Sequence, residues 1–155
     1  DNIKQKYIQY YDKRYIDGVI NHTDDSGFDL FVPCDYTFHV NETKMVDFEV
    51  SCSMLNHCNN QYVGYYLYPR SSIYKNDLVM RNRTGIIDSG YRGHIKAPLK
   101  WLGNHETYPI DTFTLEGGTR ICQICSPDLS SFCVNITDTL NETRRGEGGF
   151  GSTGK

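Results

Sequence analysis

The chain has 155 residues, of which 38% are hydrophobic and 23% charged, so its composition is that of a folded domain and excludes intrinsic disorder. The formal net charge is −3 without any basic run, which argues against a surface for nucleic acid. No apolar run approaches the roughly 18 residues of a membrane span, and no signal-peptide pattern opens the chain. We expect one intracellular domain over residues 1–155, with an N-terminal extension (1–22) and a flexible C-terminal arm (145–155).

The residue usage favours strands over helices. Twelve Tyr accompany many Ile, Val, Thr and Phe, whereas Ala97 is the single alanine. Residues 46–50 alternate loosely, and the continuous apolar and aromatic run over residues 62–68 predicts a strand buried on both faces. Residues 72–80 are the only segment that suits a helical turn or two. The amino-acid usage, rich in Asn and Tyr, also suggests an AT-rich genome such as that of a virus. A viral protein of this kind is expected in the cytoplasm or nucleus of an infected cell.

Two glycine-containing segments predict chain reversals. Residues 85–93 are typical of a strand, a tight turn and a second strand, with glycines supplying positive φ. Residues 113–115 and 121–125 form a similar pair around Gly117 and Gly118. Short strands with frequent turns indicate an all-β sandwich or barrel.

The six cysteines admit three interpretations: reduced thiols packed as small hydrophobes, a disulfide framework, or a zinc site. Cys122 and Cys125 form a single Cys-x-x-Cys pair, which supplies half of the four ligands that structural zinc needs. Five Asn-x-Thr sequons would accompany disulfides in a secreted protein, but their number exceeds chance only modestly. Reduced thiols are the favoured interpretation. The cysteines are residues 34, 52, 58, 122, 125 and 133, and the sequons begin at Asn21, Asn41, Asn82, Asn135 and Asn141.

The C-terminal segment, residues 145–154, has the composition of a phosphate-binding loop. Its glycines let backbone N–H groups approach an anion, while Ser152 and Thr153 add hydroxyl donors and Arg145 adds charge. Phe150 offers a flat face for stacking on a nucleobase. The alternative is a flexible glycine-rich tail without a ligand.

Two further segments carry candidate chemistry. Arg70, with the hydroxyls of Ser71 and Ser72, makes a second cluster of phosphate donors after Pro69, although a plain surface turn has the same composition. Asp88 precedes the Ser89-Gly90 turn, where a carboxylate serves either the turn itself or general-base catalysis.

Taken together, five segments resemble the five motifs of the trimeric dUTP diphosphatases (dUTPases), in the same order. The resemblance implies a jelly-roll-like β-barrel or sandwich, assembled as a homotrimer whose sites each draw on three chains. It also implies cleavage of dUTP to dUMP and pyrophosphate, which limits uracil incorporation into DNA, with Mg²⁺ held by phosphates and waters rather than by direct protein ligands. The segments are Asp25–Leu30, Tyr68–Ile73, Gly85–Gly93, Gly118–Gln123 and Arg145–Gly154.

The same resemblance assigns roles to individual residues. Asp88 would activate the attacking water, and Asp29 would act indirectly by orienting Arg70 and the water shell of Mg²⁺. The backbone of Gly85, Ile86 and Ile87 would pair with uracil, Tyr91 would lie under the deoxyribose, Phe150 would stack on the base, and Asn82 and Lys96 would add nucleoside contacts. The phosphates would be held by Arg70, Ser71, Ser72, Gln123, Arg145, Gly151, Ser152 and Thr153.

Three residues depart from the family pattern: Ser72 stands where glycine is more common, Gly90 where an acid is frequent, and Thr119 where aspartate is usual. None of these removes a chemical role. A dCTP deaminase of the same fold is one alternative, but the position of its catalytic glutamate is occupied here by Pro98, which cannot transfer a proton. A non-catalytic trimeric β-module that binds a nucleotide or a partner is the other, and it would not need Asp88.

Overall fold

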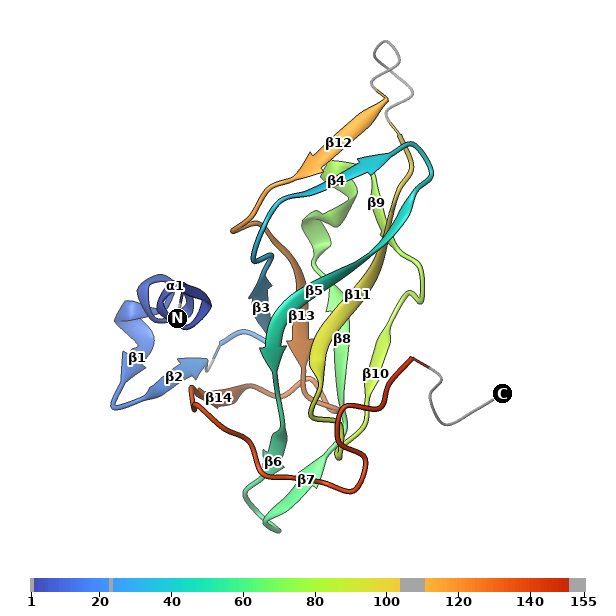
Figure 1. Ribbon diagram of the computed structural model, residues 1–155. Helices are drawn as coiled ribbons and strands as arrows, with labels where there is room; N and C mark the ends of the chain where they lie inside the picture. Colours follow the sequence, from blue (N-terminus) through green and yellow to red (C-terminus); the bar gives the residue numbers. More distant parts are fainter. Residues whose placement is uncertain (1, 23, 104–110, 151–155) are drawn as a thin grey trace.

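A computed structural model of the protein describes residues 2–22, 24–103 and 111–150 (Figure 1). These ranges contain one α-helix, two 3₁₀ helices and fourteen strands. The helices are α1 (Asn2–Tyr10), η1 (Asp12–Arg14) and η2 (Ser71–Asn76). The strands are β1 (Tyr15–Ile16), β2 (Val19–His22), β3 (Gly27–Phe31), β4 (Tyr36–His39), β5 (Thr43–Ser51), β6 (Met54–Asn56), β7 (Gln61–Val63), β8 (Tyr65–Pro69), β9 (Leu78–Met80), β10 (Gly85–Ile87), β11 (His94–Trp101), β12 (Thr112–Leu115), β13 (Arg120–Cys125) and β14 (Phe132–Asn135).

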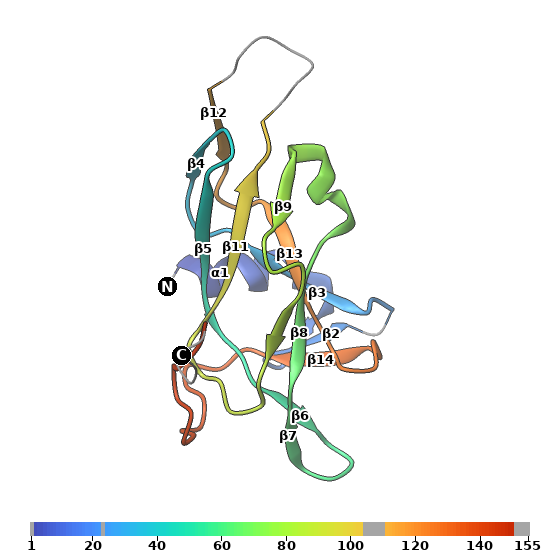
Figure 2. The ribbon, with the colours of Figure 1, turned by 90° about the vertical axis from the view of Figure 1, so that its right-hand side faces the viewer.

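Two antiparallel sheets form the body of the molecule. One has the strand order β10-β8-β13-β3 and the other β5-β11-β9, and Figure 2 shows β5 and β11 on one side and β8 and β13 on the other. Every second residue of β11, from Ile95 to Trp101, is buried against this interior. The described strands form a sandwich and smaller sheets that do not close into a barrel. The all-β prediction is therefore confirmed in its sandwich form.

Strand pairing differs from the sequence prediction at both glycine-containing segments. The turn after β10 exists, with the Tyr91 N–H donating to the Asp88 carbonyl at 3.0 Å, but β10 pairs with β8 whereas β11 pairs with β5 and β9. The predicted hairpin is therefore wrong, because the chain passes from one sheet to the other at this turn. Its glycines do not adopt positive φ either. Likewise β12 pairs with β4 and β13 with β3 and β8, although Gly118 between them does have a φ of +88°.

The aromatic run over residues 62–68 is also interrupted. It divides at Gly64 into the end of β7 and the start of β8. Within β8, Tyr65 and Leu67 are buried while Tyr66 and Tyr68 are partly exposed, so the strand has one buried face rather than two.

Helix α1 was not predicted, because a chain with one alanine offers little intrinsic helix propensity. Its formation depends on packing instead. Ile3, Tyr7 and Tyr11 recur every four residues and meet the core, where Tyr7 and Tyr11 are buried.

The six cysteines all carry free thiols, three of them exposed. Cys122 on β13 is fully buried, and this burial raises the pKa of its thiol to about 12. No helix in the described part of the chain is long and apolar enough to cross a membrane.

Candidate functional site

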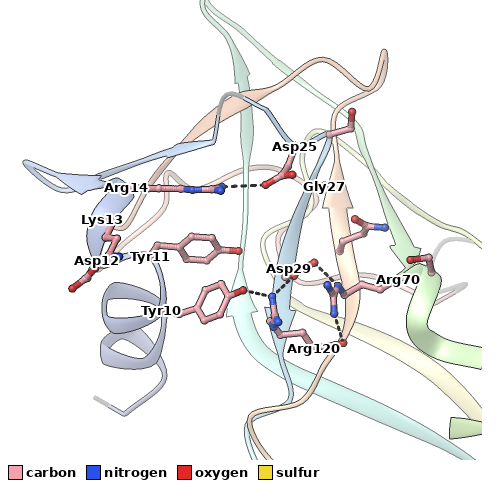
Figure 3. A pocket seen from close by; sticks show the side chains of 13 residues that line it. Tyr10, Tyr11, Asp12, Lys13, Arg14, Asp25, Gly27, Asp29, Arg70 and Arg120 are labelled. Atoms are coloured by element: carbon pink, nitrogen blue, oxygen red, sulfur yellow. Dashed lines mark hydrogen bonds and ion pairs between the residues drawn. The ribbon is translucent and has the colours of Figure 1, made fainter. Parts of the chain in front are cut away.

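The first group of functional side chains is brought together by three neighbouring strands. On β13, Gln123 lies opposite Asp29 of β3 on one side and Tyr68 of β8 on the other. Arg70 follows the end of β8, two residues beyond Tyr68, and Figure 3 shows its side chain turned toward Asp29.

Asp29 is the centre of this group. Its two carboxylate oxygens each accept from a different arginine, Arg70 Nε at 2.8 Å and Arg120 Nη1 at 2.8 Å. Arg70 also donates from Nη1 to the carbonyl of Arg120 at 3.2 Å. The Asp29 side chain is only 13% exposed, so solvent screens these ion pairs weakly. We call Asp29, Arg70 and Arg120 the Asp29 cluster.

The Asp29 cluster opens onto a cavity of about 660 Å³. Four cationic and three acidic side chains line this cavity, together with the Ser71 hydroxyl and the Gln123 amide. Gln123 donates from Nε2 to the Pro69 carbonyl at 3.3 Å. It fits only because Gly27 lacks a side chain, since a Cβ there would lie 1.9 Å from Gln123 Oε1. The full lining is Tyr10, Tyr11, Asp12, Lys13, Arg14, Asp25, Ser26, Gly27, Asp29, Arg70, Ser71, Arg120 and Gln123.

The second group forms at the turn after β10. Asp88 is exposed, and its Oδ2 accepts from Arg145 Nη1 at 2.9 Å. Gly146 forms a parallel bridge with Tyr91, and its carbonyl accepts the Arg92 N–H at 2.8 Å. The C-terminal arm of the chain therefore begins against its own Asp88 turn. We call this region the Asp88 turn.

Tyr91 is held closely at this turn. Its ring is buried, and its hydroxyl donates to the His94 carbonyl at 2.8 Å. Burial raises the pKa of this phenol, so it remains a neutral donor. A Cβ at Gly93 would lie 2.6 Å from the Tyr91 hydroxyl, and one at Gly149 would lie 3.1 Å from the ring. The ring is thus held in a fixed position between Gly93 and Gly149.

Lys96 lies on β11 beside the same turn. Its Nζ is 3.3 Å from an oxygen of Asp47, and Nδ1 of His94 is 3.1 Å from the other. Desolvation alone would raise the pKa of Asp47, but the Glu49 backbone N–H, His94 and Lys96 outweigh it and hold this pKa below its usual value. Asn82 lies in the exposed loop before β10 and joins neither group.

The two groups lie at opposite ends of β8. Ile87, just before Asp88, pairs with Tyr65 at the start of this strand, whereas Arg70 follows its last residue. Gly64, just before β8, and Arg70 are six positions apart in the sequence, which corresponds to about 20 Å of extended chain. Strand β10 runs between the groups, with the Ile86 side chain 75% exposed.

The remaining predicted residues are placed as follows. Ser72 lies on η2 beside Ser71 but does not line the cavity. Phe150 is exposed at the end of the described arm. Gly151, Ser152 and Thr153 lie outside the described residues.

The structure adds residues to the candidate site that the sequence analysis did not assign to it. Arg120 belongs to the fourth family-like segment, and its place at the start of the apolar strand β13 gave no sign that it would share Asp29 with Arg70. Tyr10 and Tyr11 also line the cavity, from a segment outside all five motifs.

Comparisons with known proteins point to one family. The dUTPase family model matches residues 19–154. The deoxyuridine 5'-triphosphate nucleotidohydrolase of Clostridium novyi is 34% identical over 134 residues, 86% of this chain and 87% of the relative. That of Escherichia phage T5 is 46% identical over 87 residues, 56% of this chain and 55% of the relative, so this match spans about half the length of the phage protein.

Solved structures show the same fold. A Staphylococcus bacteriophage 80alpha dUTPase with dUpNHpp superposes with a TM-score of 0.54 at 27% identity, covering 87% of this chain and 89% of that one. A Streptococcus mutans dUTPase, at 23% identity, superposes with a TM-score of 0.54 over 83% of this chain and 94% of its own. The jelly-roll-like prediction is thereby confirmed. With a family model that covers nearly the whole chain, these matches show that the chain belongs to the dUTPase family.

Proposed function

We propose that this protein hydrolyses dUTP to dUMP and pyrophosphate. The observation that carries the proposal is the Asp29 cluster, in which one weakly exposed carboxylate orients two arginines beside the Ser71 hydroxyl and the Gln123 amide. Planar guanidinium groups with neighbouring hydroxyl and amide donors match the oxygens of a phosphate chain. The name of the C. novyi relative and the dUpNHpp in the bacteriophage structure support the same substrate class.

In the proposed reaction a water molecule attacks the α-phosphate, and Asp88 accepts its proton. The bond between the α-phosphorus and the bridging oxygen to the β-phosphate breaks, so that pyrophosphate leaves and dUMP remains. Asp88 suits this role because its carboxylate is exposed and its hydrogen-bond partner, Arg145, belongs to the arm rather than to the sandwich. Arg70, Ser71 and Gln123 would hold the phosphates while the charge on them redistributes.

Magnesium would accompany the triphosphate and neutralise part of its charge. Both carboxylate oxygens of Asp29 already accept from arginines, and this occupancy fits a residue that orients Arg70 and the water shell of the ion. Direct coordination by the phosphates and waters is therefore the arrangement that this donor set favours.

Uracil would bind along the free edge of β10. This strand pairs with β8, and the described residues place no strand against its other edge. Such an edge presents backbone N–H and C=O groups, which suit the alternating donors and acceptors of uracil. The ring of Tyr91 would then lie under the deoxyribose, with Asn82 and Lys96 as further nucleoside contacts.

We further propose that the working site is shared between copies of the chain in a homotrimer. A general base must come within hydrogen-bond reach of the attacking water, yet about 20 Å of β8 separates the Asp88 turn from the Asp29 cluster in one chain. Asp88 of one copy would therefore meet Arg70 of a second. The arm, with Arg145, Phe150, Gly151, Ser152 and Thr153, would close over the nucleotide, and Ser72 would add a donor beside Ser71.

A pyrophosphate-release assay with dUTP, dCTP and dTTP side by side tests the activity. We expect release from dUTP alone, and equal release from all three would contradict the proposal. Ammonia release from dCTP would instead identify a deaminase. Such an activity would place the protein where deoxynucleotides are made, in the cytoplasm or nucleus, including those of a virus-infected cell.

Mixing two inactive variants tests the shared site. Asp88→Asn and Arg70→Ala each remove one half of the proposed site. If a site combines residues of different chains, unfolding and refolding the two variants together restores part of the activity, because some sites then receive both intact halves. Light scattering that gives a monomer of 17.8 kDa with full activity would contradict the trimer.

A further inference from the structure

The N-terminal segment Asn2–Arg14, which contains α1 and η1, lies outside the part of the chain that the family model matches, residues 19–154. It nevertheless forms one wall of the cavity at the Asp29 cluster, to which it contributes Tyr10, Tyr11 and Arg14 (Figure 3). Figure 1 shows α1 packed beside β3, the strand that carries Asp29. The position of this segment therefore calls for an explanation beyond the family pattern.

The segment is firmly attached to the sandwich. The buried Tyr7 hydroxyl accepts the Phe31 N–H at 3.0 Å, and its ring stacks on Phe28 with centroids 5.7 Å apart. Tyr11 stacks on the same Phe28 at 5.1 Å. Burial raises the pKa of both tyrosines, so both hydroxyls stay protonated. These anchors give the segment a defined position at the cavity.

Tyr10, between the two anchors, contacts the Asp29 cluster itself. Its hydroxyl accepts a hydrogen bond from Arg120 Nη1, and the Arg120 guanidinium lies over its ring, 4.4 Å from the centroid. The same Nη1 lies 2.8 Å from Asp29. Arg120 is therefore held from two sides, by a carboxylate of the family motif and by a tyrosine of the N-terminal segment. Of the five N–H donors of this guanidinium, the other three make no hydrogen bond to the described residues and are available to a ligand.

We propose that Tyr10 is a positioning residue for polyphosphate binding, an inference that rests on the proposed function. By stacking on Arg120 and accepting its hydrogen bond, Tyr10 holds the Arg120–Asp29–Arg70 chain in the arrangement that receives the phosphates of a nucleoside triphosphate. The N-terminal segment is thereby part of the site and not only a cover for β3.

Two conservative variants of the full-length protein, Tyr10→Phe and Tyr7→Phe, distinguish a positioning role of Tyr10 from a packing role. Tyr10→Phe keeps the ring over Arg120 and removes only the hydroxyl. We expect it to bind the analogue dUpNHpp with Mg²⁺ about tenfold more weakly, with the affinity for dUMP changed far less. Tyr10→Ala, which also removes the stacking, should weaken the analogue further. In turnover, the effect should appear in KM rather than in kcat, since Tyr10 acts on binding.

Tyr7→Phe is the matched control, because it removes a hydroxyl from the same helix without touching Arg120. It should lower Tm by about 2–6 °C through loss of the buried hydrogen bond and leave the affinity for dUpNHpp within twofold. The inference is overturned if Tyr10→Phe also binds the analogue within twofold of the parent. It is equally overturned if Tyr10→Phe weakens dUMP as much as the analogue, because the effect would then not concern the phosphate chain.

Binding of inorganic tripolyphosphate with Mg²⁺, measured by calorimetry, tests the role of Tyr10 without requiring that the protein hydrolyses dUTP. If the parent protein fails to hydrolyse dUTP, the proposed function fails, whereas calorimetry with tripolyphosphate still reports on the cavity. Weaker tripolyphosphate binding by Tyr10→Phe than by Tyr7→Phe would then support the positioning role alone.

Discussion

The Asp29 cluster and the Asp88 turn are built in opposite ways. Asp29 is weakly exposed, engages two arginines and lies on β3, a strand paired along its length with β13. Asp88 is half exposed, has one ion pair, and lies where the chain leaves one sheet for another. The first arrangement is rigid within a single chain, whereas the second depends on a C-terminal arm.

In the proposed function, this difference separates the task of holding the phosphates from the task of reacting with them. A binding group works best when its geometry is fixed before the ligand arrives, because less conformational entropy is then lost. A catalytic base needs access to water and to the substrate. Experiments that change one region and leave the other intact therefore show whether the division is real.

Replacing the proposed base should have the largest effect. Asp88→Asn keeps the size and hydrogen bonding of the side chain but removes its proton acceptor, so kcat for dUTP should fall by about 10²- to 10⁴-fold. Binding of dUpNHpp, measured by calorimetry, should persist because the Asp29 cluster is unchanged. Asp77→Asn is the matched control, since Asp77 is exposed with a φ of +50°, which asparagine tolerates. If Asp88→Asn retains turnover within a few-fold of the parent, Asp88 serves only the turn.

Removing the arm should have the next largest effect. A chain that ends before Gly146 loses the bridge to Tyr91 and the glycine-rich segment beyond it. We expect about a hundredfold loss of turnover, because closing segments exclude water and complete the site. The midpoint of thermal unfolding should change little, as the sandwich contributes most of the buried residues. Parent-like turnover by the shortened chain would show that the arm is not needed.

Disturbing the Asp29 cluster should affect stability and affinity together. Asp29→Asn leaves two arginines to share one amide oxygen, at an expected cost of about 1–3 kcal/mol in the free energy of unfolding. The affinity for dUpNHpp should fall about tenfold, since both arginines lose their orientation. Denaturant titration and calorimetry measure the two effects. Asp138→Asn, which removes a highly exposed ion pair with Lys4, should change neither. An unchanged affinity in Asp29→Asn would contradict the view of a fixed binding region.

The smallest effect concerns Asp47, which lies beside the Asp88 turn. Its pKa is lower in the folded protein than in the unfolded chain, so it stabilises the fold above the unfolded value, near 3.9. This contribution is lost as the pH falls from about 4 through the lower folded pKa. Because the pair is partly exposed, the contribution should stay below about 1 kcal/mol. Unfolding curves at pH 7 and pH 3 should differ less for Asp47→Asn than for the parent. If the change in stability between pH 7 and pH 3 is the same for Asp47→Asn and for the parent, Asp47 contributes nothing to the pH dependence of stability.

The sequence predicted individual strands better than their partners. The alternation of residues 46–50 lies within β5, whose inward positions Val46 and Phe48 are fully buried. Turn residues report that the chain reverses, but they do not report whether the next strand joins the same sheet, and this distinction depends on long-range pairing. The turn after Asp88 was therefore located correctly while its hairpin was wrong. Helix α1 left a signal in the spacing of Ile3, Tyr7 and Tyr11, which low alanine content concealed.

For the candidate site, too, local features could be predicted from the sequence and long-range ones could not. The sequence suggested Arg70 and Ser71 as phosphate donors and Asp88 as a carboxylate at a turn, because those residue types carry their chemistry locally. It did not suggest Arg120 or Tyr10, whose roles depend on which strands and helices lie side by side. Nor could it show that Asp88 and Arg70 lie at opposite ends of β8, which follows only from the register of β8 and β10.

The close approach of Gln123 to Gly27 has a consequence for how this protein can evolve. The atom that a Cβ at position 27 would strike, 1.9 Å away, is the far end of a movable side chain, so the fold can accommodate a larger residue there. The amide of Gln123 would move aside, and the cavity would lose it as a phosphate donor. Mutations at position 27 would thus pass a selection for folded protein and fail a selection for activity. A second exchange at position 123 would relieve the clash without restoring the amide, so selection for activity should hold both Gly27 and Gln123 in place.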